Sequence, residues 1–435
     1  MSLYNIGTKA YCGLHQMVKS MLVHGATNVK MFDVLQDEVN PEVLSELYPV
    51  ENVLYDDSVL LHRESYRAVY PSLCLGVSGG ATNEAWSDFI RSSKIPEGYK
   101  GGGLHYAGFI EGRGWCLPSW IWTNAALVRM YCNVGDLKSG HEIANRLLSF
   151  QEDCGGWIVR NDYTLTDVVP VLAPNDSSYI ANNAMLSMYK ITGEKRYLDS
   201  ACRCADWIMA YARPDGMVPI GYDIKRKVWQ KHNIVDTGFT AALFASLYEI
   251  TQEPKYYDFL KRFVASYIKL FYIPAKKGFA TSLDSNDQQL GGMFARGQAW
   301  ALEGIIPAYR VLQDDNIRIV IEDTISTILR LQRLDGGWAY NLTRPLMGED
   351  CKGIAVIAKA LMEWNEICPS EKLKDAARRA LEWCRKHTAV NGQARGGIFS
   401  YCMEGAVVHH LYTSTAFVYA SAYAIEVENK LKQSE

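Results

Sequence analysis

The 435-residue sequence has no run of 18 consecutive apolar residues, and it does not start with the charged and then apolar segment of a secretory signal. We therefore expect no membrane insertion and a cytoplasmic location. An excess of one charge is also absent, because 45 basic and 48 acidic residues are interspersed and give a formal net charge of −3. This balance does not favour binding to nucleic acid or to an anionic membrane surface.

Metal-site spacing is absent as well. No cysteine pair is followed by a second pair at zinc-site distance, and the nine histidines form no helical ligand pair. We therefore expect no metal and no cofactor. The eleven cysteines are odd in number and fall mostly within predicted helices, which favours reduced thiols in a cytoplasm over a disulfide framework.

What the sequence does contain is a repeat. The stretches "QEDCGGWIVR" (151–160) and "QRLDGGWAYN" (332–341) share Gln, Gly, Gly and Trp at the same places. Less literal copies fill the space between and after them, at steps of 60, 62, 59 and 60 residues between aligned glycines. Each unit contains an apolar helical pattern, a turn, an amphipathic helical pattern and a glycine loop. The period predicts a repeated helical hairpin. The aligned glycines are Gly156, Gly216, Gly278, Gly337 and Gly397.

The first helix of each hairpin is expected to be buried and the second to be exposed, because only the second carries charged residues along one face. The last inner-type helix (414–432) has no outer partner after it, and the amphipathic segment 4–25 could supply one. These features predict an all-α fold, an (α/α)6 toroid of six helical hairpins, with an open solenoid as the alternative. Inner helices are expected to begin near residues 118, 176, 236, 297, 352 and 413.

One domain is expected across residues 1–435, since 48% of the residues are hydrophobic and can bury one large core. Residues 26–112 lie outside the repeat. They are rich in Gly, Ser, Pro and Tyr and poor in helical periodicity. They predict a non-repeat insertion with short strands that covers one mouth of the barrel.

In such a toroid the N-termini of all inner helices lie at the same end, so residues about sixty positions apart meet there. Carboxylates at these positions can move protons, an arginine can bind a carboxylate in a bidentate manner, and indoles can stack on sugars. The set predicts a carbohydrate site. The structural alternatives are that the aspartates are helix N-caps, the arginine a surface cation and the tryptophans core residues. The residues are Trp120, Trp122, Asp176, Asp236, Arg296, Trp300, Asp350, His409, His410 and Thr413.

The segment "FARGQAWALEGIIPAYR" (294–310), with "VDTGFTAALFA" (235–245) and "NDSSYIANNAMLSMYKITGEKRYLDSA" (175–201), resembles the unsaturated glucuronyl hydrolases and their unsaturated rhamnogalacturonyl relatives. The resemblance covers roughly residues 115–430 and is strongest at RGQAWA (296–301). It implies a glycosidase of the (α/α)6 type, with an oligosaccharide or sugar acid as its partner. Such an enzyme hydrates the 4,5-double bond of an unsaturated uronic acid at the non-reducing end.

Carried over by position, the resemblance implies that Asp236 is the acid/base and Asp176 its partner carboxylate. Arg296 and Trp300 would bind the substrate. One departure is that Asn175 precedes Asp176, where the family usually has a histidine. To the expected substrate-binding residues we add Gln298, Trp120 and His410.

Two other classes of function stay open. One is a different sugar enzyme on the same barrel, either a conventional glycosidase or a sugar or uronate epimerase with His232, His409 and His410 as candidate bases. The other is a non-catalytic protein that binds glycans or serves polysaccharide assembly. Terpene cyclases share the QxxxGxW pattern, but the DxDD acid motif of that chemistry is absent.

Overall fold

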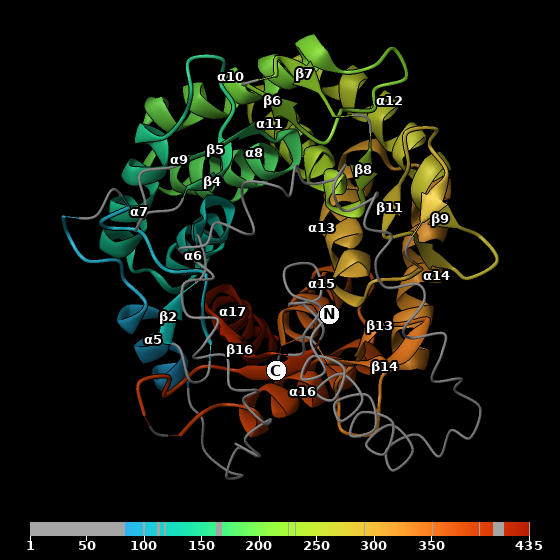
Figure 1. Cartoon of the computed structure of the whole chain (residues 1–435). Coiled ribbons are helices and arrows are strands. Elements are labelled where there is room, and N and C mark those ends of the chain that lie inside the picture. Colours follow the sequence, from blue (N-terminus) through green and yellow to red (C-terminus); the bar gives the residue numbers. More distant parts are fainter. Residues whose placement is uncertain are drawn as a thin grey trace, which may run out of the picture.

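Two concentric rings of helices surround a central axis (Figure 1). The computed structural model describes residues 83–98, 101–110, 114–116, 119–161, 168–224, 226–230, 232–290, 292–349, 351–390, 392–402 and 413–434. The inner ring of this described part contains α6 (Ile121–Val134), α8 (Pro174–Ile180) continued by η3 (Ala181–Leu186) and α9 (Ser187–Thr192), α11 (Phe239–Thr251), α13 (Ala295–Leu312), α15 (Cys351–Asn365) and α17 (Val418–Gln433). The outer ring contains α5 (Asn83–Ser92), α7 (Leu137–Ser149), α10 (Lys195–Tyr211), α12 (Pro254–Phe271), α14 (Asp315–Leu331) and α16 (Glu371–Lys386). The fold is an (α/α)6 toroid, as predicted.

The two rings differ in polarity in the way the sequence predicts. Helix α11 of the inner ring buries nine consecutive residues, Phe239–Leu247, because it has neighbours on all sides. Helix α16 of the outer ring buries one face only, which includes Leu373, Ala376, Ala377 and Ala380. The inner helices begin within five residues of the expected positions.

Short antiparallel strands lead into the inner helices. The five-stranded sheet has the order β3 (Ser119–Trp120), β4 (Ile158–Asn161), β5 (Val168–Leu172), β6 (Tyr222–Asp223) and β7 (Val228–Trp229). The six-stranded sheet has the order β13 (Ala339–Asn341), β14 (Arg344–Glu349), β15 (Phe399–Cys402), β16 (Thr413–Phe417), β1 (Gly108–Ile110) and β2 (Gly114–Cys116). Two smaller sheets are β12 (Gln289–Leu290), β11 (Ser282–Leu283) and β8 (Asn233–Ile234), and β10 (Gly278–Phe279) with β9 (Tyr272–Ile273). The strands therefore gather at the end of the barrel where the inner helices begin.

The repeated Gln-Gly-Gly-Trp motif joins one outer helix to the next. Gln332 Nε2 donates hydrogen bonds of 2.9 Å to the carbonyl oxygens of Gly336 and Ala376, and Trp338 Nε1 donates one of 2.8 Å to Ile328. The motif occurs twice because each copy makes the same set of hydrogen bonds between neighbouring outer helices. In the first copy the corresponding residues are Gln151, Gly155, Ser200, Trp157 and Leu147.

Helix α5 occupies the sixth place in the outer ring. A Cβ on Gly336, where φ is +93°, would lie 2.2 Å from the carbonyl oxygen of Arg379 in α16. A Cβ on Gly396, where φ is +87°, would likewise lie 1.8 Å from the carbonyl oxygen of Ala85 in α5. Glycine is required at both sites because the loop touches the backbone of the next outer helix. Helix α5 therefore contacts a glycine loop as α10, α12 and α16 do.

The position of α5 differs from the sequence expectation. The sequence assigned this place to segment 4–25, which lies outside the described residues, and it placed residues 83–92 in a non-repeat insertion. Ten residues make fewer than about three helical turns, which is too short a pattern to stand out from the loops around it. At least part of segment 26–112 therefore belongs to the helical ring.

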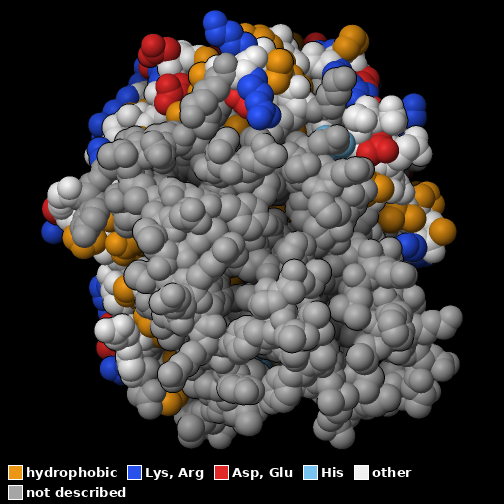
Figure 2. Space-filling model, viewed as in Figure 1, with side chains coloured by type: hydrophobic (Ala, Val, Ile, Leu, Met, Phe, Trp, Pro, Cys, Tyr) orange, Lys and Arg blue, Asp and Glu red, His pale blue; other side chains and the backbone are white. Residues whose placement is uncertain are grey.

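Both signs of charge occur on the described part of the face seen in Figure 2. In a space-filling view from the same side, basic and acidic side chains lie next to one another on the described rim of the molecule (Figure 2). Among the described residues, no helix is long and apolar enough to span a membrane.

Candidate active site

Three inner-helix N-termini bring Asp176, Asp236 and Arg296 to one end of the barrel. Asp176 is the third residue of α8, Asp236 lies in the 3-10 turn η4 (Val235–Gly238) that precedes α11, and Arg296 is the second residue of α13. Both aspartates are buried, with 6% and 8% of their surface exposed. The charge of Asp236 acts on Asp176, and the charge of Arg296 acts on Asp236. The three residues form one electrostatically connected group.

Neither aspartate is a helix N-cap. The N-caps of α8, η4 and α11 are Ala173, Ile234 and Gly238, and none of them makes a side-chain capping bond. The carboxylate of Asp236 accepts a hydrogen bond from the side chain of Asn175, as well as from the backbone of Asp236 and Thr237 in its own turn. Asp236 therefore interacts with the first turn of its own helix and also with a residue of α8.

Tight packing fixes the turn that carries Asp236. Tyr267 of α12 donates a hydrogen bond of 2.5 Å to the carbonyl oxygen of Val235. A Cβ on Gly297 would lie 2.7 Å from Cγ1 of Val235, so only a glycine lets α13 approach this closely. Because Arg296 precedes Gly297 on α13, the same approach brings the guanidinium near Asp236.

Burial has the largest effect on the protonation of both acids. It raises the pKa of Asp236 to about 7, although the hydrogen bond from Asn175 and the charge of Arg296 lower it. Burial, and then the charge of Asp236, raise the pKa of Asp176 well above its usual range. Two buried carboxyl groups that interact in this way hold at least one proton near neutral pH. The pair can therefore both give and take a proton under neutral conditions.

Arg296 lies among aromatic rings. Its guanidinium carbon is 4.3 Å from the ring centroid of Phe294, 5.0 Å from that of Trp300 and 5.9 Å from that of Tyr340. A half-buried guanidinium in aromatic surroundings is weakly hydrated, so it attracts a carboxylate more strongly than an exposed one does. This arrangement suits recognition of an acidic sugar.

Three buried polar atoms of described residues at this end of the barrel have no hydrogen-bond partner within the part of the chain that the structure describes. They are Oδ1 of Asn175, Oδ1 of Asp236 and Nε1 of Trp300. Each unsatisfied buried atom costs about 1–3 kcal/mol. A ligand that carries both donors and acceptors, such as a sugar with its hydroxyl groups, would satisfy them.

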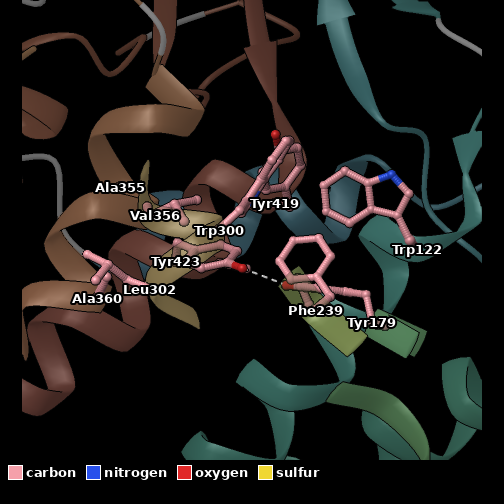
Figure 3. Close-up of a cluster of buried hydrophobic side chains, with 14 of the residues drawn as sticks. Trp122, Tyr179, Phe239, Trp300, Leu302, Ala355, Val356, Ala360, Tyr419 and Tyr423 are labelled. Carbon is pink, nitrogen blue, oxygen red and sulfur yellow. Dashed lines mark hydrogen bonds between the residues drawn. The ribbon is translucent and has the colours of Figure 1, made fainter. Parts of the chain in front are cut away.

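A packed group of buried aromatic rings surrounds Trp300 (Figure 3). Trp122 lies 5.2 Å from Tyr179 and 5.9 Å from Trp300 between ring centroids. Phe239 lies 4.6 Å from Tyr179 and 5.7 Å from Trp300. None of the four is more than 7% exposed. The rings thus form an apolar support that links the helices carrying the two acids.

Gln298 serves the backbone instead of the site. It is fully buried, its Nε2 donates to the carbonyl oxygens of Phe279 (2.9 Å) and Phe294 (3.1 Å), and its Oε1 accepts from the amide of Phe279 (2.7 Å). A helix turns by about 200° over two residues and returns to the same face after four, so Trp300 shares the face of Arg296 and Gln298 does not. We therefore leave Gln298 out of the proposed substrate-binding residues.

The remaining expected residues lie on other elements or outside the described residues. The backbone of Trp120 belongs to β3, Thr413 begins β16, and His232 is buried four residues before Asp236. Asp350, His409 and His410 lie outside the described residues. The candidate site is therefore built from the residues of α8, η4 and α13.

Sequence reasoning did not assign a role to Asn175 or to Phe239. Asn175 appeared only as a departure from the family pattern, whereas the structure joins it to Asp236 by a hydrogen bond. Phe239 follows Asp236 by three residues and packs on Trp300. Helical spacing was the available signal, because residues three apart on a helix share a face.

Comparisons with known proteins agree with this architecture. The family described as Glycosyl Hydrolase Family 88 matches residues 145–429. A comparison with curated protein sequences gives no significant match.

Solved structures with similar folds include two unsaturated glucuronyl hydrolases. The enzyme from Bacillus sp. GL1, described as responsible for the degradation of glycosaminoglycan, has a TM-score of 0.64 at 16% identity, over 81% of this chain and 96% of that chain. One specific for heparin has a TM-score of 0.63 at 17% identity, over 81% and 97%. The cellobiose 2-epimerase from Bacillus thermoamylovorans B4167 has a TM-score of 0.62 at 13% identity, over 79% and 95%. At these identities the structures support the fold alone.

Proposed function

Because this chain belongs to Glycosyl Hydrolase Family 88 and is a carbohydrate-active enzyme, we propose that it hydrates the double bond of a 4,5-unsaturated uronic acid at the non-reducing end of an oligosaccharide. The observation that carries the proposal is the pair of buried acids, one with a pKa of about 7, beside an arginine. The reaction needs one group that first donates and then accepts a proton. A carboxyl group with a pKa near the working pH suits both steps.

In the proposed reaction, protonated Asp236 transfers its proton to C4 of the sugar. Positive charge then develops at C5 and on the ring oxygen. The Asp236 carboxylate takes a proton from a water molecule as the water oxygen bonds to C5, which restores the starting acid. The product is a hemiketal that opens at its ring oxygen, and the next sugar is then released.

Asp176 and Arg296 set the conditions for this proton transfer. Asp176 keeps its own proton, because burial and the charge of Asp236 raise its pKa. Arg296 pairs with the substrate carboxylate, with Trp300 beside it as a surface for the sugar ring. Once this pair forms, Arg296 no longer lowers the pKa of Asp236, so the catalytic proton is held more firmly with substrate bound.

The test uses a panel of unsaturated glucuronyl and galacturonyl disaccharides and follows the ultraviolet absorbance of the conjugated double bond. Wild-type protein should remove this absorbance, and Asp236→Asn should slow the loss by about 10²–10⁴-fold or more, since an amide cannot donate and recover the proton. Asp223→Asn is the matched control, because Asp223 is also buried but is the last residue of β6 and accepts a hydrogen bond from the amide of Arg226. If the wild type leaves the whole panel unchanged, the proposal fails, and the epimerase or the non-catalytic alternative takes its place.

A further inference from the structure

A second cluster of buried charges lies deeper in the barrel, about two helical turns after the N-termini of the inner helices. Arg129 of α6 donates to both carboxylate oxygens of Glu426 of α17, at 2.9 and 2.8 Å. Its guanidinium also lies 3.6 Å from Glu303 of α13, and Lys359 of α15 lies 3.1 Å from the same carboxylate. No side chain of the four is more than 11% exposed. The proposed reaction uses none of them.

Two tyrosines connect this cluster with the helix that carries Asp176. The hydroxyl of Tyr423 donates to Glu303 at 2.9 Å and lies 2.6 Å from the hydroxyl of Tyr179 (Figure 3). Tyr179 belongs to α8 and follows Asp176 by three residues and Asn175 by four. These three residues therefore share one face of the helix. Any rotation of α8 about its axis would move all of them together.

The backbone of this helix changes its pattern directly after Ile180. Residues Ala181–Leu186 form a π-helical segment, which accommodates an extra residue within a helix and is frequent at functional sites. Within it, Asn183 Nδ2 donates to the carbonyl oxygen of Tyr179 at 3.1 Å, and Asn183 Oδ1 accepts from Arg129 at 2.7 Å. Arg129 also donates to the hydroxyl of Tyr179 at 3.3 Å. One guanidinium thus binds both the π-helical segment and the tyrosine that precedes it.

We propose that Arg129, acting through Tyr179 and Asn183, is a positioning residue that fixes how the N-terminus of α8 presents Asp176 to Asp236. A guanidinium suits this task because its N–H groups point in fixed directions. Its own place is fixed by Glu426 on α17, the inner helix that packs next to α6. The catalytic part of this proposal rests on the proposed function.

The first test compares two tyrosine variants. Tyr179→Phe keeps the ring in its aromatic surroundings and removes only the hydroxyl that the cluster holds. We expect kcat to fall about tenfold while KM changes less than about twofold, since misplacing a catalytic group affects the reaction more than binding. Tyr197→Phe is the matched control. Tyr197 is equally buried and its hydroxyl donates to Asn145 at 2.8 Å, but it lies on outer helix α10. Its kcat should equal that of the wild type.

The second test does not depend on turnover. Carbon-13 NMR of aspartate carboxyl groups, with the Asp176 signal assigned by its loss in Asp176→Asn, reports the protonation of the site in the free protein. Tyr179→Phe and Asn183→Leu should shift the titration midpoint of Asp176, because its distance to Asp236 changes, and Tyr197→Phe should not. If wild-type protein turns over no substrate, the proposed function fails but this measurement still decides the positioning role. An unchanged midpoint and an unchanged kcat in folded Tyr179→Phe would overturn the inference.

Discussion

The barrel buries charged groups at two levels, and their surroundings favour the charged form at the deep level and the neutral form at the mouth. Deep in the barrel, burial opposes the charge of Arg129, but Glu426 and two tyrosines outweigh it, so the pKa of Arg129 stays well above its usual range. At the mouth, burial outweighs the stabilising effects of Asn175 and Arg296, so the pKa of Asp236 rises to about 7. Burial alone therefore does not create a reactive acid. A reactive acid arises where a carboxyl group is buried with too little compensating positive charge.

Breaking the deep level should have the largest effect on stability. Arg129→Leu leaves Glu426 buried without its cation, and we expect a loss of about 3–5 kcal/mol in the free energy of unfolding. Lys255→Met is the control, because Lys255 pairs with Asp206 at 2.9 Å with both side chains about half exposed and should cost less than about 1 kcal/mol. Denaturant unfolding measures both. Equal losses would mean that the buried pair contributes no more to stability than the exposed pair.

Removing the charge of Asp236 at the mouth should increase the free energy of unfolding instead of lowering it. The folded pKa of Asp236 is about 7, above an unfolded value of about 4. The folded state therefore binds more protons between these two values, and stability falls as pH rises through this window. A shift of about three units corresponds to about 4 kcal/mol once the group is ionised in both states. Asp236→Asn carries no charge, so it should be more stable than the wild type by up to about 4 kcal/mol at pH 8 and by about 1 kcal/mol at pH 5. Denaturant unfolding at the two pH values checks this. A variant less stable at pH 8 would show that the carboxylate is well compensated.

A smaller effect is expected when the cation at the mouth is removed. Arg296→Ala should raise KM about tenfold with a smaller change in kcat, because the substrate carboxylate loses its partner in both the ground state and the transition state. Arg318→Ala, on outer helix α14 and paired only with Glu322 at 2.9 Å among the described contacts, is the control. Steady-state kinetics separate the two constants. A fall in kcat alone would assign Arg296 to the chemical step.

The smallest effect is a separation of two pH profiles. Because Asp236 must be protonated to act, kcat/KM should fall as pH rises above about 7. With substrate bound, the pair between its carboxylate and Arg296 removes an influence that lowers this pKa, so the fall in kcat should occur about 0.5–1 unit higher. Initial rates across the pH range give both limbs. Coincident limbs would mean that the substrate does not neutralise Arg296.

Sequence periodicity predicted the fold because the signals were local. Each glycine loop and each hairpin lies within about sixty residues, and the meeting of Asp176 with Asp236 follows from the ring once the ring is known. The pair of Arg129 and Glu426 was not predictable in this way, because the two residues are 297 positions apart and meet only when the ring closes. The hydrogen bonds that Gln298 makes to the backbone of Phe279 were not predictable from the motif either, because the two residues meet only in the folded structure. Helical geometry does place Gln298 on another face from Arg296.

Ring closure also constrains how the molecule is made. Helix α17 packs against α15 on one side and against α5 and α6 on the other, and β16 pairs with β1. Helix α17, which is synthesised after the other described inner helices, therefore packs against α6, the first of them. Contacts between residues this distant in sequence form slowly. Until α17 arrives, Arg129 has no Glu426, and the flanks of α6 and α15 have no neighbour. A chain that stops before α17 does not form a smaller barrel with five hairpins. It leaves an open ring in which Arg129 has lost its bidentate partner Glu426, and we expect proteases to degrade such a chain.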